Sequence, residues 1–164
     1  MSYTKKDYES DNGMLTSVWG PPMWHFLHTM SFNYPVKPTD KDKHIYMNFI
    51  KNLGDILPCK YCRENFKKNM KEHPINIEDM KNRKTFSMYI YKLHNVINTM
   101  LGKENKLSYN EVRMIYEHFR SRCNKTVKRC ITPKKGIKKT KCVINIVPFN
   151  SKTKTFNISK KCNN

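Results

Sequence analysis

Two stretches of this sequence decide its fold: Pro58-Cys59-Lys60-Tyr61-Cys62 and His94-Asn95-Val96-Ile97-Asn98-Thr99-Met100-Leu101-Gly102-Lys103. The first places a CxxC pair at the expected start of a helix. The second ends a helix, because Gly102 is a typical C-terminal stop and Lys103 complements the helix dipole. A CxxC alone indicates a redox or a zinc site. A CxxC together with a helix that carries a histidine and two asparagines on or near one face indicates redox chemistry with a bound cofactor.

Hydrophobic periodicity predicts five helices in residues 1–120. They span approximately Gly20 to Tyr34, Thr39 to Leu57, Cys59 to Lys71, Lys84 to Leu101 and Ser108 to Phe119. Pro21-Pro22 is expected in the first turn of the first helix, where proline is accepted. Ser108-Tyr109-Asn110-Glu111 has the pattern of a capping box. Because the linkers are short, neighbouring helices should pack antiparallel. The predicted fold is all-α: a four-helix bundle plus a short fifth helix.

The C-terminal part of the chain differs in composition. All 13 acidic residues lie at or before Glu117, whereas residues 121–164 contain 13 of the 32 Lys and Arg residues. We therefore divide the chain into an N-terminal tail (1–13), a bundle domain (14–120) and a basic, cysteine-containing extension (121–164). Weak alternation at 143–149 and 153–158 is compatible with a β-hairpin, although Pro148 disfavours a central strand. Such an extension can bind nucleic acid through phosphates, but a solvated or partner-binding segment is favoured.

The chain has 164 residues and no apolar run long enough to span a membrane. Residues 1–12 are polar and mixed in charge, unlike a signal peptide. These features predict a cytoplasmic protein. Disulfides are rare in the cytosol unless they are catalytic, so the six cysteines indicate chemistry or metal binding rather than a disulfide-linked scaffold.

Cys59 and Cys62 are the candidate catalytic groups. At a helix N-terminus, unpaired N–H groups and the dipole favour a thiolate, and two thiols three residues apart can close and reopen a disulfide. The alternative is half a zinc site, which needs a second ligand pair. The nearest candidates are His73, which stands alone, and Cys123 with Cys130, whose spacing is too wide for a zinc knuckle. The sequence therefore favours redox chemistry, and no metal site is predicted.

Two helical faces combine aromatic and polar residues. His94 and Asn98 lie four residues apart, and Trp24 and His28 have the same spacing. From the pattern alone, core histidines bonded to neighbouring helices explain both pairs. Two such faces in one small bundle beside a CxxC favour a flat aromatic cofactor between the helices. The cofactor would stack on Trp24 and Tyr116, with polar contacts from His28, His94, Asn95, Asn98 and Lys103. The sequence has no Gly-rich loop, which excludes a Rossmann-type site.

Four motifs in order carry a resemblance to a known family. Residues 19–30 fit Gly-x-x-x-Trp-x-x-Leu-His, residues 33–38 fit Tyr-Pro-x-x-Pro, and residues 58–62 fit Pro-Cys-x-x-Cys. Residues 94–103 fit His-Asn-x-Val-Asn-x-x-Leu-Gly-Lys, with Ile97 in place of the valine. These motifs resemble those of the Erv/ALR family of FAD-linked sulfhydryl oxidases, and the resemblance covers about residues 18–120.

The resemblance implies FAD in the mouth of the bundle, a CxxC facing its isoalloxazine ring, and usually a homodimer. It adds Gly20, Tyr34 and Leu101 to the expected cofactor-binding residues. The implied reaction is thiol oxidation. A protein dithiol attacks Cys59, the outer sulfur, while Cys62 lies against the flavin, and the electrons pass through FAD to O2 to give H2O2.

Three positions depart from the family pattern. The family often has arginine where this chain has Pro21. Many members join the fourth helix to the following loop by a disulfide, at positions that correspond here to Tyr91 and Ser108. The C-terminal tryptophan of many members is best matched by Tyr116. The missing disulfide and the compact chain resemble the sulfhydryl oxidases of large cytoplasmic DNA viruses, which implies a place of action in the host cytoplasm or the virion.

Two alternatives stay open at this point. Family members often carry a second, mobile cysteine pair that relays electrons to the CxxC. The candidates here are Cys123 and Cys130, with Cys142 and Cys162 further along, and structural bridges are the competing explanation. The alternative function is a zinc-binding or nucleic-acid-binding module that uses the cysteines and the basic extension. A thioredoxin-like carrier is disfavoured, because no convincing strand precedes Cys59.

Overall fold

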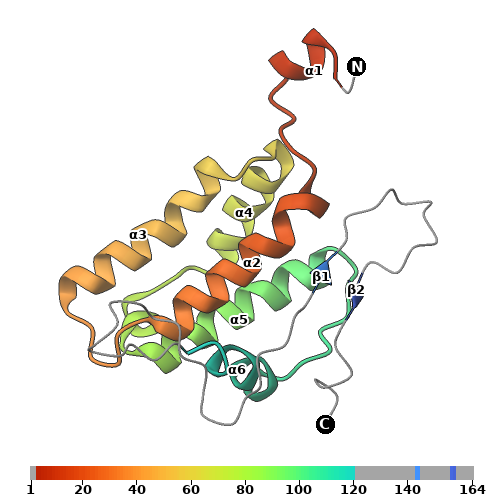
Figure 1. The fold of residues 1–164 in the computed structure, drawn as a ribbon. Helices are drawn as coiled ribbons and strands as arrows, with labels where there is room; N and C mark the ends of the chain where they lie inside the picture. Colours follow the sequence, from red (N-terminus) through yellow and green to blue (C-terminus); the bar gives the residue numbers. More distant parts are fainter. Residues whose placement is uncertain (1–2, 121–142, 145–155, 158–164) are drawn as a thin grey trace, which may run out of the picture. The chain divides into compact units, whose positions relative to one another are not determined.

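The computed structural model describes residues 3–120, 143–144 and 156–157 (Figure 1). Its helices are α1 (Lys5–Glu9), α2 (Thr16–Asn33), α3 (Asp40–Ile56), α4 (Lys60–Glu72), the 3-10 helix η1 (Ile77–Met80), α5 (Arg83–Met100) and α6 (Tyr109–Glu117). Helices α2 to α5 form the bundle and α6 is the short fifth helix, so the predicted fold class is confirmed. The two short helices α1 and η1 were not predicted. None of the helices described is both long and apolar enough to cross a membrane.

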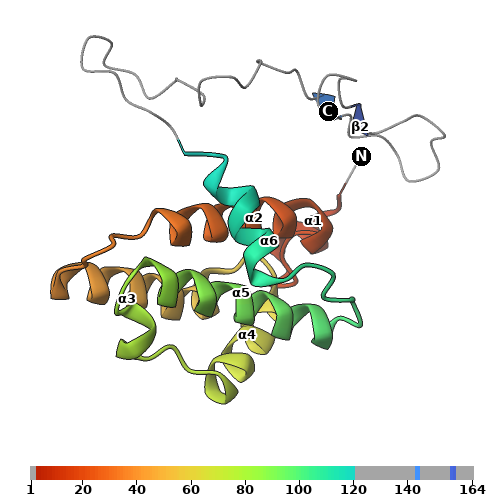
Figure 2. The same cartoon turned by 90° about the horizontal axis from the view of Figure 1, so that it is seen from below.

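The bundle is built from two helix pairs. Helix α2 packs against α5, and α3 packs against α4. The short helix α6 contacts both α2 and α5 and crosses them (Figure 2). This arrangement brings the middle of α2, with Trp24 and His28, against the C-terminal half of α5, with His94.

Helix α2 begins at Thr16 rather than near Gly20, so the prediction that Pro21-Pro22 occupy its first turn is wrong. Both prolines lie inside the helix. The residue before a proline is normally disfavoured in helical conformation, because the proline ring clashes with its Cβ. Gly20 has no Cβ, which removes this clash before Pro21 but not before Pro22, since Pro21 carries a Cβ. The indole N–H of Trp19 also donates to the carbonyl of Met14 at 3.1 Å, which fixes the start of the helix.

Side-chain caps define the starts of α3 and α6. Thr39 and Asp42 form a capping box: the Asp42 N–H donates to Thr39 Oγ1 at 3.1 Å, and the Thr39 N–H donates to the Asp42 carboxylate at 2.8 Å. The predicted box at α6 is also present, with the Ser108 N–H donating to the Glu111 carboxylate at 2.7 Å. Each box satisfies N–H groups that a helix start would otherwise leave unpaired.

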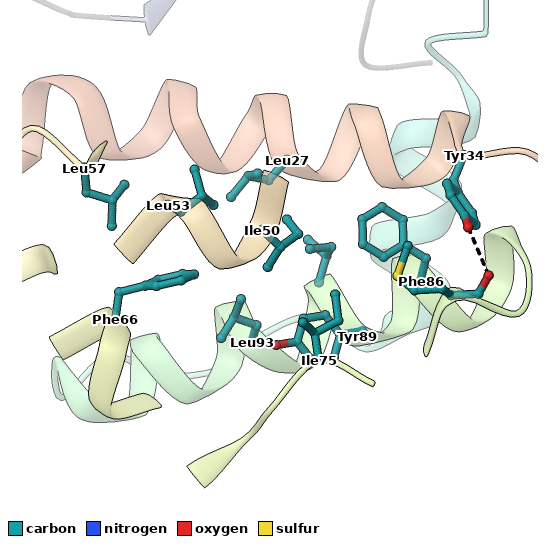
Figure 3. Packing of buried hydrophobic residues seen from close by; sticks show 12 residues of the cluster. Leu27, Tyr34, Ile50, Leu53, Leu57, Phe66, Ile75, Phe86, Tyr89 and Leu93 are labelled. Atoms are coloured by element: carbon teal, nitrogen blue, oxygen red, sulfur yellow. Dashed lines mark hydrogen bonds between the residues drawn. The ribbon is translucent and has the colours of Figure 1, made fainter. Parts of the chain in front are cut away.

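The core lies between α2, α3 and α5, and α4 adds one aromatic ring to it (Figure 3). Its most buried side chains are at most 2% exposed: Tyr34, Ile50, Leu53, Met80, Phe86, Ile90 and Leu93. Tyr34 closes one end, where its hydroxyl donates to the carbonyl of Met80 at 3.0 Å. Trp24, Cys62 and Ile97 pack against this cluster while remaining partly exposed. The catalytic candidate Cys62 therefore packs on the same core that holds the bundle together.

Hydroxyl groups connect α5 to the segment before α6. The Tyr91 hydroxyl donates to the carbonyl of Leu107 at 2.9 Å. The hydroxyls of Ser87 and Tyr109 lie 2.8 Å apart, and one donates to the other. Tyr91 and Ser108 are the positions that the family resemblance aligns with a disulfide of other members. In this chain the Tyr91 hydroxyl bonds to the residue before Ser108.

The chain divides into two units, Met1–Phe119 and Arg120–Asn164. From the second unit the structure describes the strands β1 (Val143–Ile144) and β2 (Phe156–Asn157), which pair antiparallel. The rest of the expected hairpin lies outside the described residues, so the hairpin as a whole stays a prediction. The extension cysteines also lie outside them: Cys123, Cys130, Cys142 and Cys162. The domain limits proposed from the sequence likewise stay predictions.

Candidate functional site

The two cysteines of the CxxC lie at the N-terminus of α4. Cys59 is the N-cap, and its sulfur accepts a hydrogen bond from the Cys62 N–H at 3.3 Å. Both residues are partly buried free thiols. Burial raises the pKa of the Cys62 thiol, and the neighbouring Cys59 raises it further. Burial also opposes ionisation of Cys59, but hydrogen bonds from Cys62 and Thr16 outweigh it and lower the pKa of Cys59. Cys59 is therefore the sulfur that ionises first.

The N-terminal segment (residues 11–16) packs along the CxxC. The Met14 N–H donates to the carbonyl of Pro58 at 2.6 Å, and the Lys60 N–H donates to the carbonyl of Asn12 at 3.3 Å. These bonds form a single antiparallel bridge between Gly13 and Cys59. The end of the predicted N-terminal tail thus contributes directly to the structure around the sulfurs.

Two further contacts attach the N-terminal segment to α4. The Arg63 guanidinium donates to the Asp11 carboxylate at 2.7 Å and to the carbonyl of Leu57 at 2.9 Å. Gly13 has a φ of +82°, and a Cβ there would lie 2.4 Å from the Pro58 oxygen. This backbone conformation and this close approach both require glycine. Sequence reasoning missed the bridge, although the Asn12-Gly13 dipeptide is a turn signal that marks the position.

A pair of histidines joins α2 to α5. His28 Nε2 and His94 Nδ1 lie 3.0 Å apart and share a hydrogen bond. Burial, with a smaller contribution from the neighbouring His94, lowers the pKa of His28 to about 4. Burial also lowers the pKa of His94 to about 4, with a contribution from the charge of Lys103. Both rings are therefore neutral at pH 7, and one N–H is shared between them.

Aromatic rings from three helices surround the histidine pair. Trp24 stacks on His94, with ring centres 4.0 Å apart and planes 7° apart. Tyr116 stacks on His28 at 5.1 Å and on Phe32 at 5.5 Å. The structure thus brings Trp24, His28, His94 and Tyr116 together, as the sequence predicted for a cofactor site.

These residues fit a flat cofactor with hydrogen-bonding edges. His28 is 3% exposed, and its Nδ1 is a buried atom for which the described residues provide no hydrogen-bond partner. A buried polar atom without a partner costs free energy unless a ligand or water satisfies it. Neutral imidazoles and stacked aromatic faces suit an uncharged ring system such as the isoalloxazine of FAD. The donor set and the orphaned Nδ1 together fit a flavin.

The remaining predicted site residues fall into two groups. Asn95 and Asn98 lie on α5 next to His94 and are partly buried, and Leu101 and Lys103 are exposed just after its last turn. Gly20 and Tyr34 are buried in the bundle: Gly20 lies inside α2 before Pro21, and Tyr34 is fully buried with its hydroxyl bonded to Met80. Their assignment as cofactor-binding residues stays a prediction.

Among the residues described, no group of three or more His, Cys, Asp or Glu side chains lies together as a metal site would require.

An antiparallel helical bundle with a CxxC at one helix start, a neutral histidine pair and stacked rings is the architecture of a helical dithiol redox protein. A family model described as "Erv1 / Alr family" matches residues 21–130. The chain belongs to this family.

Several curated relatives are similar over much of their length. The chain is 30% identical over 122 residues to a probable FAD-linked sulfhydryl oxidase of Acanthamoeba polyphaga mimivirus, which covers 74% of this chain and 77% of that protein. It is 29% identical over 99 residues to the FAD-linked sulfhydryl oxidase of African swine fever virus, covering 60% and 80% respectively. The match to FAD-linked sulfhydryl oxidase ERV1 of Arabidopsis thaliana is 32% identical but covers 51% of this chain and 42% of that protein.

Solved structures of the family share the fold. The yeast Erv1 core superimposes with a TM-score of 0.57 and 25% identity, over 71% of this chain and 91% of that one. The FAD-binding domain of Erv1 from Saccharomyces cerevisiae gives the same TM-score with 27% identity, over 63% and 95%.

Proposed function

We propose that this protein is an FAD-linked sulfhydryl oxidase that introduces disulfide bonds into protein substrates with O2 as the electron acceptor. The observation that carries the proposal is the Cys59–Cys62 pair at the start of α4, in a bundle whose histidine pair has an orphaned buried nitrogen. Membership of the Erv1/Alr family and the names of the viral and eukaryotic relatives support it.

The cysteine pair performs the exchange with substrate. In the oxidised pair, a substrate thiolate attacks Cys59 Sγ, the Cys59–Cys62 bond breaks, and its electron pair leaves on Cys62 Sγ. The second substrate thiol then attacks the mixed disulfide, and Cys59 leaves as a thiolate. A thiol with a lowered pKa leaves more readily, which matches the direction found for Cys59. The substrate loses two electrons and two protons, and the pair gains two electrons.

The bundle prepares the cofactor site. A flavin bound here would accept the electron pair from the two cysteines and transfer it to O2 as H2O2. Trp24 and Tyr116 offer stacking faces, while His28, His94, Asn95, Asn98 and Lys103 offer hydrogen bonds and charge. Since both histidines stay uncharged at neutral pH, they can hold a neutral ring edge without introducing a buried charge.

Flavin content tests the proposal directly. The purified protein should be yellow and should release FAD on denaturation, and colourless protein from FAD-replete cells would contradict it. His94→Ala should weaken FAD binding about 5- to 150-fold, because a lost buried hydrogen-bond partner costs about 1–3 kcal/mol. Titration of the flavin-free protein with FAD measures this change. His44→Ala, which removes an exposed histidine from α3, is the matched control and should leave the affinity unchanged.

We further propose that Cys123 and Cys130 relay electrons from protein substrates to Cys59. Replacing both by serine should leave the oxidation of dithiothreitol unchanged, because a small thiol reaches Cys59 directly. Oxidation of a reduced protein should slow about tenfold or more, since a tethered cysteine pair acts at a high effective concentration. Replacing Cys142 and Cys162 by serine is the matched control. Equal losses in both double variants would contradict a relay and favour structural bridges.

A homodimer and a viral or cytoplasmic setting complete the proposal. Phe26 on α2 is 51% exposed and packs edge-on against Phe49 of α3, and Ile45 is 54% exposed on α3. These side chains provide an apolar surface that a second copy could cover, and light scattering measures the resulting mass. Relatives from mimivirus and African swine fever virus support action in the host cytoplasm or the virion.

A further inference from the structure

Thr16 lies next to the CxxC because the N-terminal segment packs against the start of α4, although the two are distant in sequence. It is the first residue of α2 and the last residue of the N-terminal segment. Its Oγ1 lies 3.3 Å from Cys62 Sγ, within hydrogen-bond distance of a sulfur. The bridge of Gly13 to Cys59 holds this segment against α4. The position of the hydroxyl is therefore set by backbone contacts and not by its own side-chain rotamer alone.

We infer that Thr16 is a positioning residue for the redox pair, whose hydroxyl donates a hydrogen bond to the Cys62 thiolate when the disulfide opens. The inference rests on the proposed function, because it concerns the same sulfur pair. Thr16 lies outside every motif found in the sequence, so the CxxC motif does not predict this role.

The need for such a donor follows from the surroundings of Cys62. Attack on Cys59 Sγ breaks the Cys59–Cys62 bond and leaves the electron pair on Cys62 Sγ, while the proton of the substrate thiol passes to solvent. Burial makes this new thiolate unfavourable and raises the pKa of Cys62. The hydroxyl of Thr16 acts in the opposite direction and lowers the pKa of both thiols. A hydrogen bond to a charged group is stronger than one to a neutral group, so Thr16 stabilises the opened pair more than the closed one.

Thr16→Val tests the inference, because valine keeps the shape of threonine and removes the hydroxyl. The measurement uses the full-length chain as purified under reductant, with Cys59→Ser added so that Cys62 cannot close the disulfide. Serine is a good N-cap and preserves the start of α4. Iodoacetamide alkylation of Cys62 is followed by mass spectrometry as a function of pH. In Thr16→Val the midpoint of the alkylation profile should rise by about one pH unit. Below the midpoint, this shift corresponds to a thiolate fraction of Cys62 about tenfold smaller than in the parent.

Two variants separate the hydroxyl from other effects. Thr16→Ser restores the hydroxyl and should return the midpoint to that of the parent. Ser17→Ala removes the neighbouring hydroxyl from the same first turn and should not move it. An unchanged midpoint in Thr16→Val, or equal shifts in Thr16→Val and Thr16→Ser, would overturn the inference.

The readout does not depend on oxidase activity. If the protein carries no flavin and consumes no oxygen, the proposed function fails, but the pH profile of Cys62 still reports whether Thr16 donates to its sulfur. If flavin and turnover are present and the profile does not move, the role of Thr16 alone is overturned.

Discussion

Replacing Cys62 by serine is expected to lower oxygen consumption with dithiothreitol by at least about a thousandfold, because removal of one member of a catalytic unit abolishes nearly all of its effect. The variant cannot form the Cys59–Cys62 disulfide, and Cys62 is one of only two cysteines in the described residues. An oxygen electrode gives the rate. The absorbance spectrum gives the flavin content, which should equal that of the parent.

The comparison variants make this result specific. Oxygen consumption should fall to the same extent in Cys59→Ser, since this variant removes the sulfur that we propose exchanges with substrate. Cys142→Ser, a substitution in the extension, should keep the parent rate with dithiothreitol. Near-normal turnover in Cys62→Ser would show that another cysteine pair performs the chemistry.

Acidification should destabilise the bundle well before its carboxylates are protonated. Folding lowers the pKa of His28 from 6.5 to about 4, so the unfolded chain binds a proton in this range that the folded chain does not. The contribution of His28 to the free energy of unfolding should therefore be largest above pH 6.5 and decrease as the pH drops towards 4. The expected slope is up to about 1.4 kcal/mol per pH unit from His28. His94 adds a smaller part, because it is more exposed and shares the same hydrogen bond.

Denaturant unfolding between pH 7 and 4.5 measures this slope. Capping hydrogen bonds lower the pKa of the Asp42 and Glu111 carboxyls from their ordinary values of 3.8 and 4.5. Their stabilisation is lost at still lower pH, so the two effects separate. His28→Gln should flatten the slope, whereas His44→Gln, an exposed substitution on α3, should retain it. A parent protein with constant stability over this range would refute the assignment of a neutral buried pair.

Local chemistry made much of this architecture predictable. Ser108 and Glu111 are spaced for a capping box, and the box is present. Gly102 predicted the end of α5 and adopts a φ of +66° there. Trp24, His28 and His94 were placed on facing helices because each lies four residues from an aromatic or polar partner, and their rings are in contact. In each case the signal lies within one helical turn.

Long-range contacts were not predictable in the same way. The bridge of Gly13 to Cys59 and the approach of Thr16 to Cys62 join residues that are 46 apart in sequence. No periodicity connects such residues, and a single bridge leaves no alternating pattern to recognise. The start of α2 was misplaced for a different reason: both prolines were assigned to a first turn, whereas the helix continues through them, with Gly20 removing the Cβ clash at Pro21.

The hydrogen bonds of Tyr91 to Leu107 and of Ser87 to Tyr109 join α5 to the start of α6 and the segment before it without a disulfide. Residues 1–120 contain Cys59 and Cys62 and no other cysteine, so reductant has no supporting cross-link to cut within them. An excess of thiol substrate can therefore drive turnover without destabilising the bundle. In a variant with serine at positions 123, 130, 142 and 162, the unfolding midpoint measured with and without reductant should differ only by the contribution of the CxxC. A bundle held in this way can fold under reducing conditions, because none of the contacts described within residues 3–120 requires a disulfide.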